Sequence, residues 1–173
     1  MRIILSSILI FFLFFTNQAF SEQKIAFIDM DRVISTSKSG SSILKQLTDL
    51  NNKNLQFLKK EEKKFKEKEI KLISQKNIIS EANFQNKVNE LKSEIKNYNQ
   101  NKDKMINEFN KLKVDNTNNL LKLINPILLK FSDDKKISIV LQKKDLVVAK
   151  TELDITEDII KIVNTEIKEL KIK

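Results

Sequence analysis

Apolar residues recur seven positions apart through the middle of the chain, in a stretch otherwise dominated by charge. Residues 59–75 (KKEEKKFKEKEIKLISQ) include eleven charged side chains, yet Phe65 and Leu72 keep the seven-residue spacing. The residues at this spacing are Leu44, the polar Asn51, Leu58, Phe65, Leu72 and Ile79. A stripe this narrow on a highly charged helix predicts packing against another helix, as in a coiled coil.

A second stripe, with alternating steps of three and four, follows in a different phase. Its members are Phe84, Val88, Leu91, Ile95, Tyr98, Met105, Phe109 and Leu112, with Lys102 as an interruption. The phase changes beside Ser80, a residue suited to cap a new helix. We therefore expect antiparallel helices over Ser42–Ile78 and Glu81–Asn125, joined by a tight tip at Asn77–Ser80. The only proline, Pro126, predicts a kink or a restart of the returning helix.

Short segments with strand and turn patterns flank this hairpin. The expected elements before it are a strand at Lys24–Met30 (KIAFIDM), a helical turn at Met30–Ile34 capped by Asp29, and a loop at Ser35–Ser42 that holds the only glycine, Gly40. The expected elements after it are a turn at Asp133–Lys136, strands at Ile137–Leu141 and Leu146–Lys150, and an amphipathic helix at Asp154–Leu170 capped by Asp154 or Thr156.

The fold class that these elements predict is α+β. Residues 22–40 and 132–173 would form a small β-rich body with one N-terminal strand, two C-terminal strands and a closing helix, while residues 41–131 would form a coiled-coil arm. A body this small, with open strand edges, is marginal as a monomer, so we expect symmetric association of several chains.

The N-terminus has the pattern of a secretory signal peptide. Met1-Arg2 supplies a positive charge, Ile3–Phe15 is uncharged and short for a membrane span, and Ala19-Phe20-Ser21 offers small residues before a cleavage site. We expect cleavage before Glu22 and export of the mature chain, which predicts a periplasmic location. An uncleaved membrane anchor is the alternative.

The composition removes several classes of chemistry. The chain has no cysteine and no histidine, so disulfides, Ser/His/Asp and Cys/His catalysis and zinc sites of His or Cys are excluded. A single glycine leaves no phosphate-cradling loop, and no acidic cluster has the spacing of a calcium loop. Asp133-Asp134 resembles an acid/base pair but is better explained as a solvated turn. We expect no enzymatic activity, no catalytic or metal-binding residue and no cofactor.

The positive charge of the mature chain lies in the arm. Residues 41–131 hold 19 lysines against 11 acidic residues, a net charge of +8, whereas residues 22–40 and 132–173 are each neutral. The abundance of lysine over arginine is also typical of an A/T-rich genome, so the location of the charge is more informative than its size. Apolar residues away from the seam are Phe57, Ile70, Ile73, Ile78 and Ile106. They are either tolerated surface residues or a soft binding surface.

Three segments resemble one family across essentially the whole mature chain. They are IAFIDMDRVISTSKSG at the start, with Asp29 and Arg32; LISQKNIISEANFQNKVNEL at the tip; and INPILLKFSDDKKISIVLQKKDLVVAK with TELDITEDIIKIVN near the end. Together with the order of elements and the signal peptide, they resemble the Skp/OmpH family of periplasmic chaperones. The surface departs from that family in being dominated by lysine rather than by mixed lysine and arginine.

The resemblance implies a jellyfish-like homotrimer, in which the bodies associate and three hairpins enclose a cavity. Such proteins hold unfolded outer-membrane β-barrel proteins without ATP and keep them soluble for assembly. The expected trimer residues are Ile25, Phe27, Ile139, Leu141 and Val147. The expected client-binding residues of the arm are Phe57, Lys63, Lys64, Lys66, Lys68, Ile70, Ile73 and Phe84. Anionic membrane surfaces and lipopolysaccharide are further candidate partners, although no lipopolysaccharide-contact site matches residue by residue.

Two other functions fit parts of the pattern. An exported coiled-coil spacer or adaptor would bind a folded envelope partner through an apolar patch at the tip, for which Ile78-Ile79 is the candidate. Basic helices with interleaved aromatic residues also fit a nucleic-acid binder. Export and the near absence of arginine argue against nucleic acid as a partner.

Overall fold

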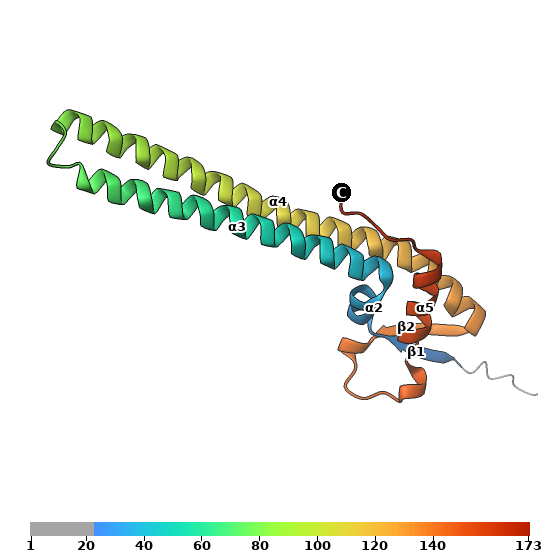
Figure 1. Cartoon of the computed structure of the whole chain (residues 1–173). Helices are drawn as coiled ribbons and strands as arrows, with labels where there is room; N and C mark the ends of the chain where they lie inside the picture. Colours follow the sequence, from blue (N-terminus) through green and yellow to red (C-terminus); the bar gives the residue numbers. More distant parts are fainter. Residues whose placement is uncertain (1–22) are drawn as a thin grey trace, which may run out of the picture.

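The computed structural model describes residues 23–173, so the expected signal peptide and its cleavage site lie outside the described residues. Figure 1 shows a long hairpin that projects from a small body. The elements are β1 (Lys24–Ile28), α2 (Met30–Thr36), α3 (Lys38–Ser74), α4 (Glu81–Lys135), β2 (Ile137–Gln142), the 3-10 turns η1 (Lys143–Asp145) and η2 (Thr151–Leu153), and α5 (Thr156–Glu166). The predicted α+β class with a helical hairpin is confirmed.

The hairpin is formed by α3 and α4, and its tip lies between Ser74 and Glu81. The first arm begins and ends four residues earlier than the pattern predicted. Ser80 caps α4 as expected, because its hydroxyl accepts a hydrogen bond from the Asn83 amide at 3.4 Å. The arm therefore reverses direction where the phase of the apolar stripe changes.

The predicted loop at Ser35–Ser42 is wrong, since α2 and α3 meet across Ser37 alone. Asp29 caps α2 as predicted, through its carboxylate and the Arg32 amide at 2.9 Å. Ser37 then caps α3 by accepting from the Gly40 amide. Gly40 lies inside α3, where a Cβ atom would stand 1.8 Å from the Ile34 carbonyl oxygen. Glycine is needed here because two helices cross closely, and it does not mark a loop.

The predicted restart of the helix at Pro126 is also wrong, because α4 continues through Pro126 to Lys135. Pro126 lies on the exposed face, while Ile124 and Ile127 on either side are buried. Their packing against the body offsets the hydrogen bond that proline cannot make. The turn expected at Asp133–Lys136 is correspondingly shorter: α4 ends at Lys135 and is capped by Lys136, whose φ of 54° is left-handed.

The body contains a two-stranded parallel sheet in which Ile25 pairs with Ile139 and Phe27 with Leu141. The third strand expected at Leu146–Lys150 does not form. These residues are a loop between η1 and η2, and Val147 is 100% exposed. Branched side chains favour a strand, but a strand also needs a neighbouring ladder, and nothing in the single chain supplies one here.

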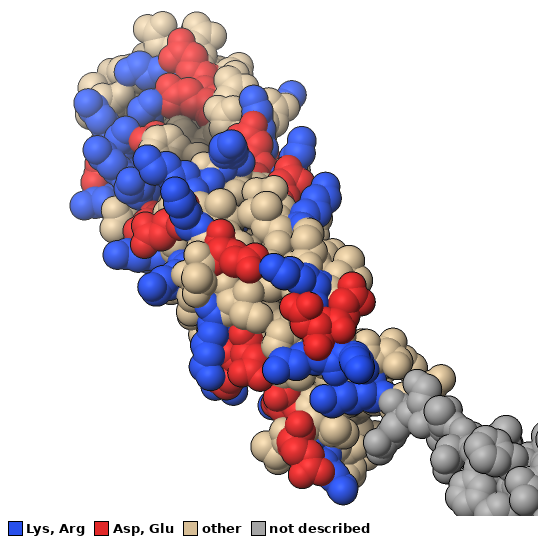
Figure 2. Space-filling view, turned by 90° about the vertical axis from the view of Figure 1, so that its right-hand side faces the viewer, with Lys and Arg blue, Asp and Glu red and all other residues tan. Residues whose placement is uncertain are grey.

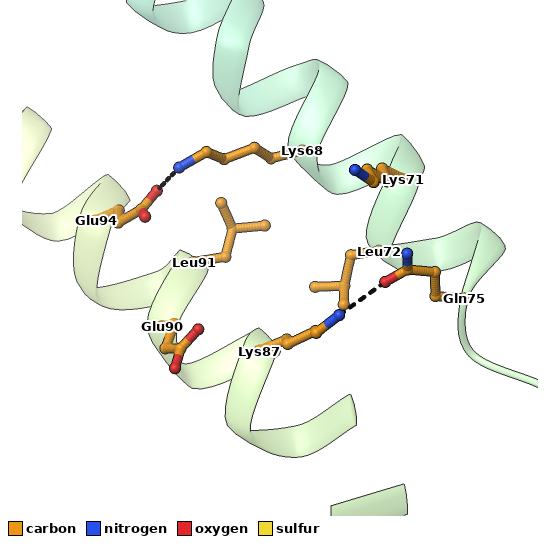
Figure 3. A pocket seen from close by; sticks show the side chains of 8 residues that line it. All are labelled: Lys68, Lys71, Leu72, Gln75, Lys87, Glu90, Leu91 and Glu94. Carbon is orange, nitrogen blue, oxygen red and sulfur yellow. Dashed lines mark hydrogen bonds and ion pairs between the residues drawn. The ribbon is translucent and has the colours of Figure 1, made fainter. Parts of the chain in front are cut away.

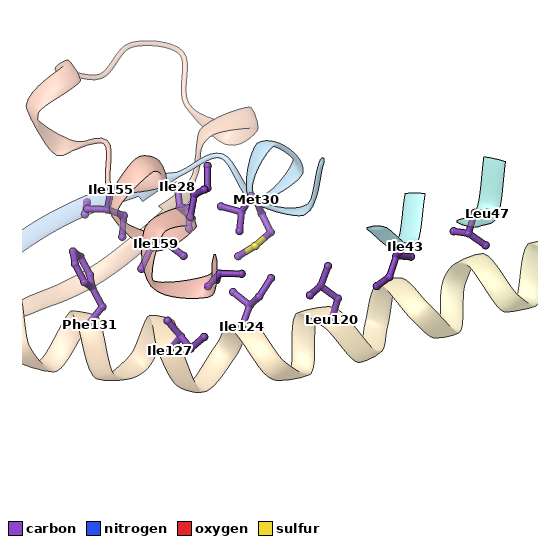
Figure 4. Packing of buried hydrophobic residues seen from close by; sticks show 14 residues of the cluster. Ile28, Met30, Ile43, Leu47, Leu120, Ile124, Ile127, Phe131, Ile155 and Ile159 are labelled. Atoms are coloured by element: carbon purple, nitrogen blue, oxygen red, sulfur yellow. The ribbon is translucent and has the colours of Figure 1, made fainter. Parts of the chain in front are cut away.

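The body core lies where the last third of α4 crosses α2, β1 and α5 (Figure 4). Val33, Ile124, Ile159 and Val163 have no exposed surface. The cluster extends to Ile43 and Leu47 at the base of α3, which anchors the arm to the body. A single continuous helix, α4, thus belongs to both the body and the arm.

The closing helix is shorter than predicted and ends at Glu166. Its N-cap is Ile155, which makes no side-chain capping bond, so the expected cap by Asp154 or Thr156 is wrong. The Asp154 carboxylate instead accepts hydrogen bonds from the amide and the hydroxyl of Thr156. Beyond it, Lys168–Lys173 runs back beside the base of the hairpin without regular secondary structure (Figure 1). None of the helices in residues 23–173 is both long and apolar enough to span a membrane.

Candidate functional site

The seam is the contact surface between α3 and α4. In each heptad of α3, one of the two positions that face α4 is apolar and the other is polar. Leu58 is 9% exposed, and Phe65 and Leu72 are partly buried, as the stripe predicted. Leu44 is instead 38% exposed, because Ile43 and Leu47 take the buried positions at the base. The companion positions on α3 are polar: Asn54, Glu61, Lys68 and Gln75. The shaft, which is the part of the hairpin between the body and the tip, therefore buries less apolar surface than a regular coiled coil.

Polar contacts replace apolar ones near the tip, as Figure 3 shows. The Lys68 ammonium lies 2.5 Å from the Glu94 carboxylate, and Lys87 donates to the Gln75 side-chain oxygen at 3.0 Å. Both pairs join α3 to α4 across a shallow cleft of about 300 Å³ floored by Leu72 and Leu91. Because these pairs are exposed to solvent, they align the two helices more than they stabilise the hairpin.

Tyr98 is the most perturbed ionisable group in the shaft. Its hydroxyl donates to the Glu62 carboxylate at 3.0 Å, and its ring meets Phe65 edge to face at a centroid distance of 5.3 Å. Desolvation, followed by the hydrogen bond to Glu62, raises the pKa of Tyr98 to about 12. Lys102 also reaches Glu62, at 3.5 Å. One carboxylate on α3 thus holds two side chains of α4.

A groove of about 420 Å³ opens halfway along the shaft. Asn51 on α3 and Lys102 on α4, the interruptions of the two stripes, both contribute to its lining. Its lining is largely apolar and consists of Asn51, Asn54, Leu55, Leu58, Lys59, Glu62, Lys102, Met105, Ile106, Phe109 and Asn110. Leu55 and Ile106 are 47% and 44% exposed, so the groove offers apolar surface to solvent. Sequence reasoning noted both interruptions but not that a single groove includes both.

The lysines expected to bind a client differ in their surroundings. Lys63, Lys64 and Lys68 form ion pairs with Glu67, Glu61 and Glu94, respectively. Among the described residues, Lys66 has no ion pair, nor do the exposed Lys59, Lys60 and Lys71. Figure 2 shows the same mixture of signs, with acidic residues interspersed among the more numerous basic ones. These four lysines contribute part of the excess positive charge of the arm.

The apolar residues expected at the binding surface are also divided. Phe57, Ile70 and Ile73 are 50%, 60% and 63% exposed, so their side chains face solvent. Phe84 is partly buried in the seam. Ile78 at the tip is 79% exposed, whereas its neighbour Ile79 is partly buried. The arm thus exposes separate apolar side chains over its length.

Four of the five residues expected at a trimer interface lie on one face of the sheet. Residues 25 and 27 share a face by alternation, and their partners across the ladder are Ile139 and Leu141. Ile25, Ile139 and Leu141 are 40–45% exposed, whereas Phe27 is covered by its own chain and only 6% exposed. Val147 stands apart in the loop. The inner edge of β1 is closed by Asp154, so the free edge of the sheet belongs to β2.

No ionisable cluster in the described part of the chain is arranged to hold a metal ion. The two clefts of the shaft are lined by lysine, glutamate, asparagine and apolar side chains. The described residues thus form a long helical arm with two solvent-exposed clefts on a small body.

Comparison with known proteins places this architecture in a family. A family model described as "Outer membrane protein (OmpH-like)" matches residues 24–163. The chain belongs to the OmpH-like family. No curated protein matches the sequence significantly.

A solved structure has the same fold. It is a crystal structure of a proposed OmpH-like outer membrane chaperone from Caulobacter crescentus CB15, with a TM-score of 0.80 and 14% sequence identity. The alignment covers 88% of this chain and 90% of that one. The likeness shows that the body and the arm keep their arrangement although most side chains differ.

Proposed function

We propose that this protein is an ATP-independent periplasmic holdase, which keeps unfolded outer-membrane β-barrel proteins soluble by holding them between basic helical arms. The observation that carries the proposal is the arm itself. It extends far from the body, has a thin seam and exposes apolar side chains among unpaired lysines. Membership of the OmpH-like family supports the same conclusion.

The charge of the arm suits a weak and general attraction to acidic chains. Its net charge of +8 is spread over two long helices and is partly offset by ion pairs within the arm. Such a surface raises the rate of encounter with a negatively charged chain without fixing one geometry. The same field would attract an anionic membrane surface or lipopolysaccharide.

The apolar contacts of the arm would then hold the captured chain. The mid-shaft groove offers apolar surface from Leu55 and Ile106, and Phe57, Ile70 and Ile73 would add separate contacts. Each contact is weak alone, but contacts from several arms to one flexible chain add through a high effective concentration. This arrangement would bind client chains of many different sequences and would not select a particular one.

The body would join three arms in a homotrimer. The exposed Ile25, Ile139 and Leu141 form an apolar sheet face, and β2 has a free edge. The neighbouring loop exposes Val147 and Val148 almost completely. Burying these groups against other copies would remove apolar surface from water and cover the open edge.

A dilution assay tests the proposal. A urea-unfolded outer-membrane β-barrel protein is diluted into buffer with the mature protein, and light scattering is followed. We expect scattering to be suppressed at a ratio near one trimer per client, without nucleotide. The mass of the free protein and of the complex, from light scattering after size exclusion, checks the trimer. Unsuppressed aggregation, together with tight binding of one folded envelope protein, would favour the spacer function.

A further inference from the structure

The segment after α5 is held by the arm as an extended chain. We call Lys168–Lys173 the C-terminal tail; it lies beside the base of the hairpin in Figure 1. The family match ends at residue 163, so the tail lies outside the part of the chain that the family describes. The side-chain oxygen of Asn164, in the last turn of α5, accepts a hydrogen bond from the Lys38 amide at 2.6 Å and ties this end of the helix to the start of α3.

Gln46 of α3 contacts the tail as a neighbouring strand would. Its Nε2 donates to the main-chain oxygen of Leu170 at 2.8 Å, and its Oε1 accepts from the Ile172 amide at 3.2 Å. A side-chain amide carries the same donor and acceptor as a peptide group. Bonds to the oxygen of one residue and the N–H two positions later are those of a parallel ladder. Gln46 therefore stands in for one residue of a β-strand.

Asn116 of α4 makes the second pair of contacts. Its Nδ2 donates to the main-chain oxygen of Lys173, and its Oδ1 accepts from the Lys173 amide, both at 3.4 Å. Asn116 is only 6% exposed, and a further bond to the Leu112 carbonyl at 2.8 Å fixes its orientation. Within the tail, both side-chain amides contact main-chain atoms only, so these bonds do not depend on the sequence of the tail.

The side chains of the tail supply an alternating pattern. Leu170 and Ile172 pack against the hydrophobic cluster of the body, whereas Lys171 between them is exposed. The tail site, defined as Gln46, Asn116 and the apolar surface beneath Leu170 and Ile172, thus selects an extended chain with apolar residues at alternate positions.

We propose that the tail site is a docking site for extended segments of an unfolded polypeptide, and that the tail occupies it in cis as a tethered competitor. This inference rests on the proposed holdase function and names which client segments bind at the base of the arm. Strands of membrane β-barrels alternate apolar and polar residues and match the pattern that the tail displays. Pairing through main-chain atoms is a general way to bind such strands. The tether keeps the site closed until a client is present at high local concentration.

The first experiment compares the full-length mature protein with a variant that ends at Glu166. The probe is a fluorescein-labelled peptide of residues 164–173, and binding is followed by anisotropy. We expect the truncated protein to bind the peptide at least about tenfold more tightly than the full-length protein, because the native tail competes at a high effective concentration. An Ile172→Pro peptide lacks the N–H that Gln46 accepts from and should bind much more weakly.

A second peptide decides whether the site is general. It keeps Ile167, Leu170 and Ile172 but replaces Lys168, Glu169 and Lys171 by Gln. Equal binding of this peptide, and its displacement by a urea-unfolded β-barrel protein, would support the proposal. Binding of the native peptide alone, or no peptide binding by a folded truncated protein, would overturn it. If either of these contradicting results comes with normal holdase activity, only the tail-site proposal fails and the proposed function stands. If the full-length protein has no holdase activity, both proposals fail.

A full-length variant covers the case in which truncation prevents folding. The chain has no cysteine and no tryptophan, so Lys173→Cys can carry a bimane label and Lys113→Trp, one turn from Asn116, can quench it. Binding of an unfolded client should displace the tail and relieve the quenching, while a folded control protein should not. Quenching that stays unchanged when the client is fully bound would overturn the proposal.

Discussion

Gly40 is the position where one added methyl group should cost the fold most. A Cβ atom at this residue would lie 1.8 Å from the carbonyl oxygen of Ile34 and 2.7 Å from its carbon, and both belong to the backbone of α2. The φ angle of Gly40 is not positive, so its backbone conformation would accept a side chain. The close approach of the Ile34 backbone is what excludes one. The contact sets how α2 crosses α3 and therefore where the arm leaves the body.

Two opposing terms set the size of the Gly40→Ala effect. Helix propensity alone would stabilise the variant by about 1 kcal/mol. Against it, the Ile34 oxygen must recede by about 1.6 Å to reach an ordinary contact of 3.4 Å. Val33 and Ile43, which are 0% and 3% exposed, resist that movement. Overpacking and the loss of these contacts together predict a net destabilisation of about 2–4 kcal/mol.

Urea unfolding followed by far-ultraviolet circular dichroism measures the effect at matched protein concentration. Ser41→Ala is the control, because it adds the same helix former at the next residue, which is exposed. We expect the control to change stability by less than about 0.5 kcal/mol. A Gly40→Ala protein that unfolds at the same urea concentration as the native protein, or a higher one, would refute the close-crossing explanation.

Four other changes test separate parts of the molecule. Phe27→Asp should leave largely unfolded, dissociated chains in size exclusion, because an unpaired charge would enter a site that is 6% exposed; folded trimers of the variant would contradict this. Deletion of Asn54–Lys111 with a short connecting turn should preserve the body and its association but abolish suppression of aggregation, since Asn54 and Asn110 face each other across the shaft; retained activity would place client binding on the body. Client association in stopped flow should slow as salt rises from about 20 to 500 mM, and replacing the unpaired lysines by Gln should mimic high salt without removing a shaft contact; the variant residues are Lys59, Lys60, Lys66 and Lys71. The single tyrosine should titrate by absorbance near pH 12; because its folded pKa is raised, its contribution to stability is full below about pH 10 and is lost as the pH rises through 12, and Glu62→Gln should lower the midpoint.

The arm was predictable because its pattern is local. The seven-residue spacing of Leu58, Phe65 and Leu72 survives in the seam, and the change of phase at Ser80 marks the tip correctly. At the base the same spacing fails, because Ile43 and Leu47 pack against the body core and turn Leu44 outwards. A heptad pattern describes a partner helix, but it carries no information about a third element.

The errors share one cause, which is that contacts distant in sequence overrode local preference. Gly40 predicts a loop and Pro126 a kink or a restart, yet each lies inside one helix because the surrounding side chains pack well. Val147 and Val148 favour a strand, but no neighbouring strand lies beside them in the single chain. The tail site was not foreseen, since neither Gln46 nor Asn116 stands out before the fold brings them to one segment.

The polar half of the seam bears on the choice between a holdase and a spacer. A spacer must transmit a fixed distance, so both heptad positions would be apolar along its length. Here the companion positions of α3 are Asn54, Glu61, Lys68 and Gln75, and the exposed ion pairs that replace apolar contacts contribute little stability. The body instead has several side chains with no exposed surface. Because local opening follows low apolar burial, we expect the arm to be more flexible than the body. The proposed holdase function requires flexible arms to hold clients of different size, whereas a spacer requires a rigid arm.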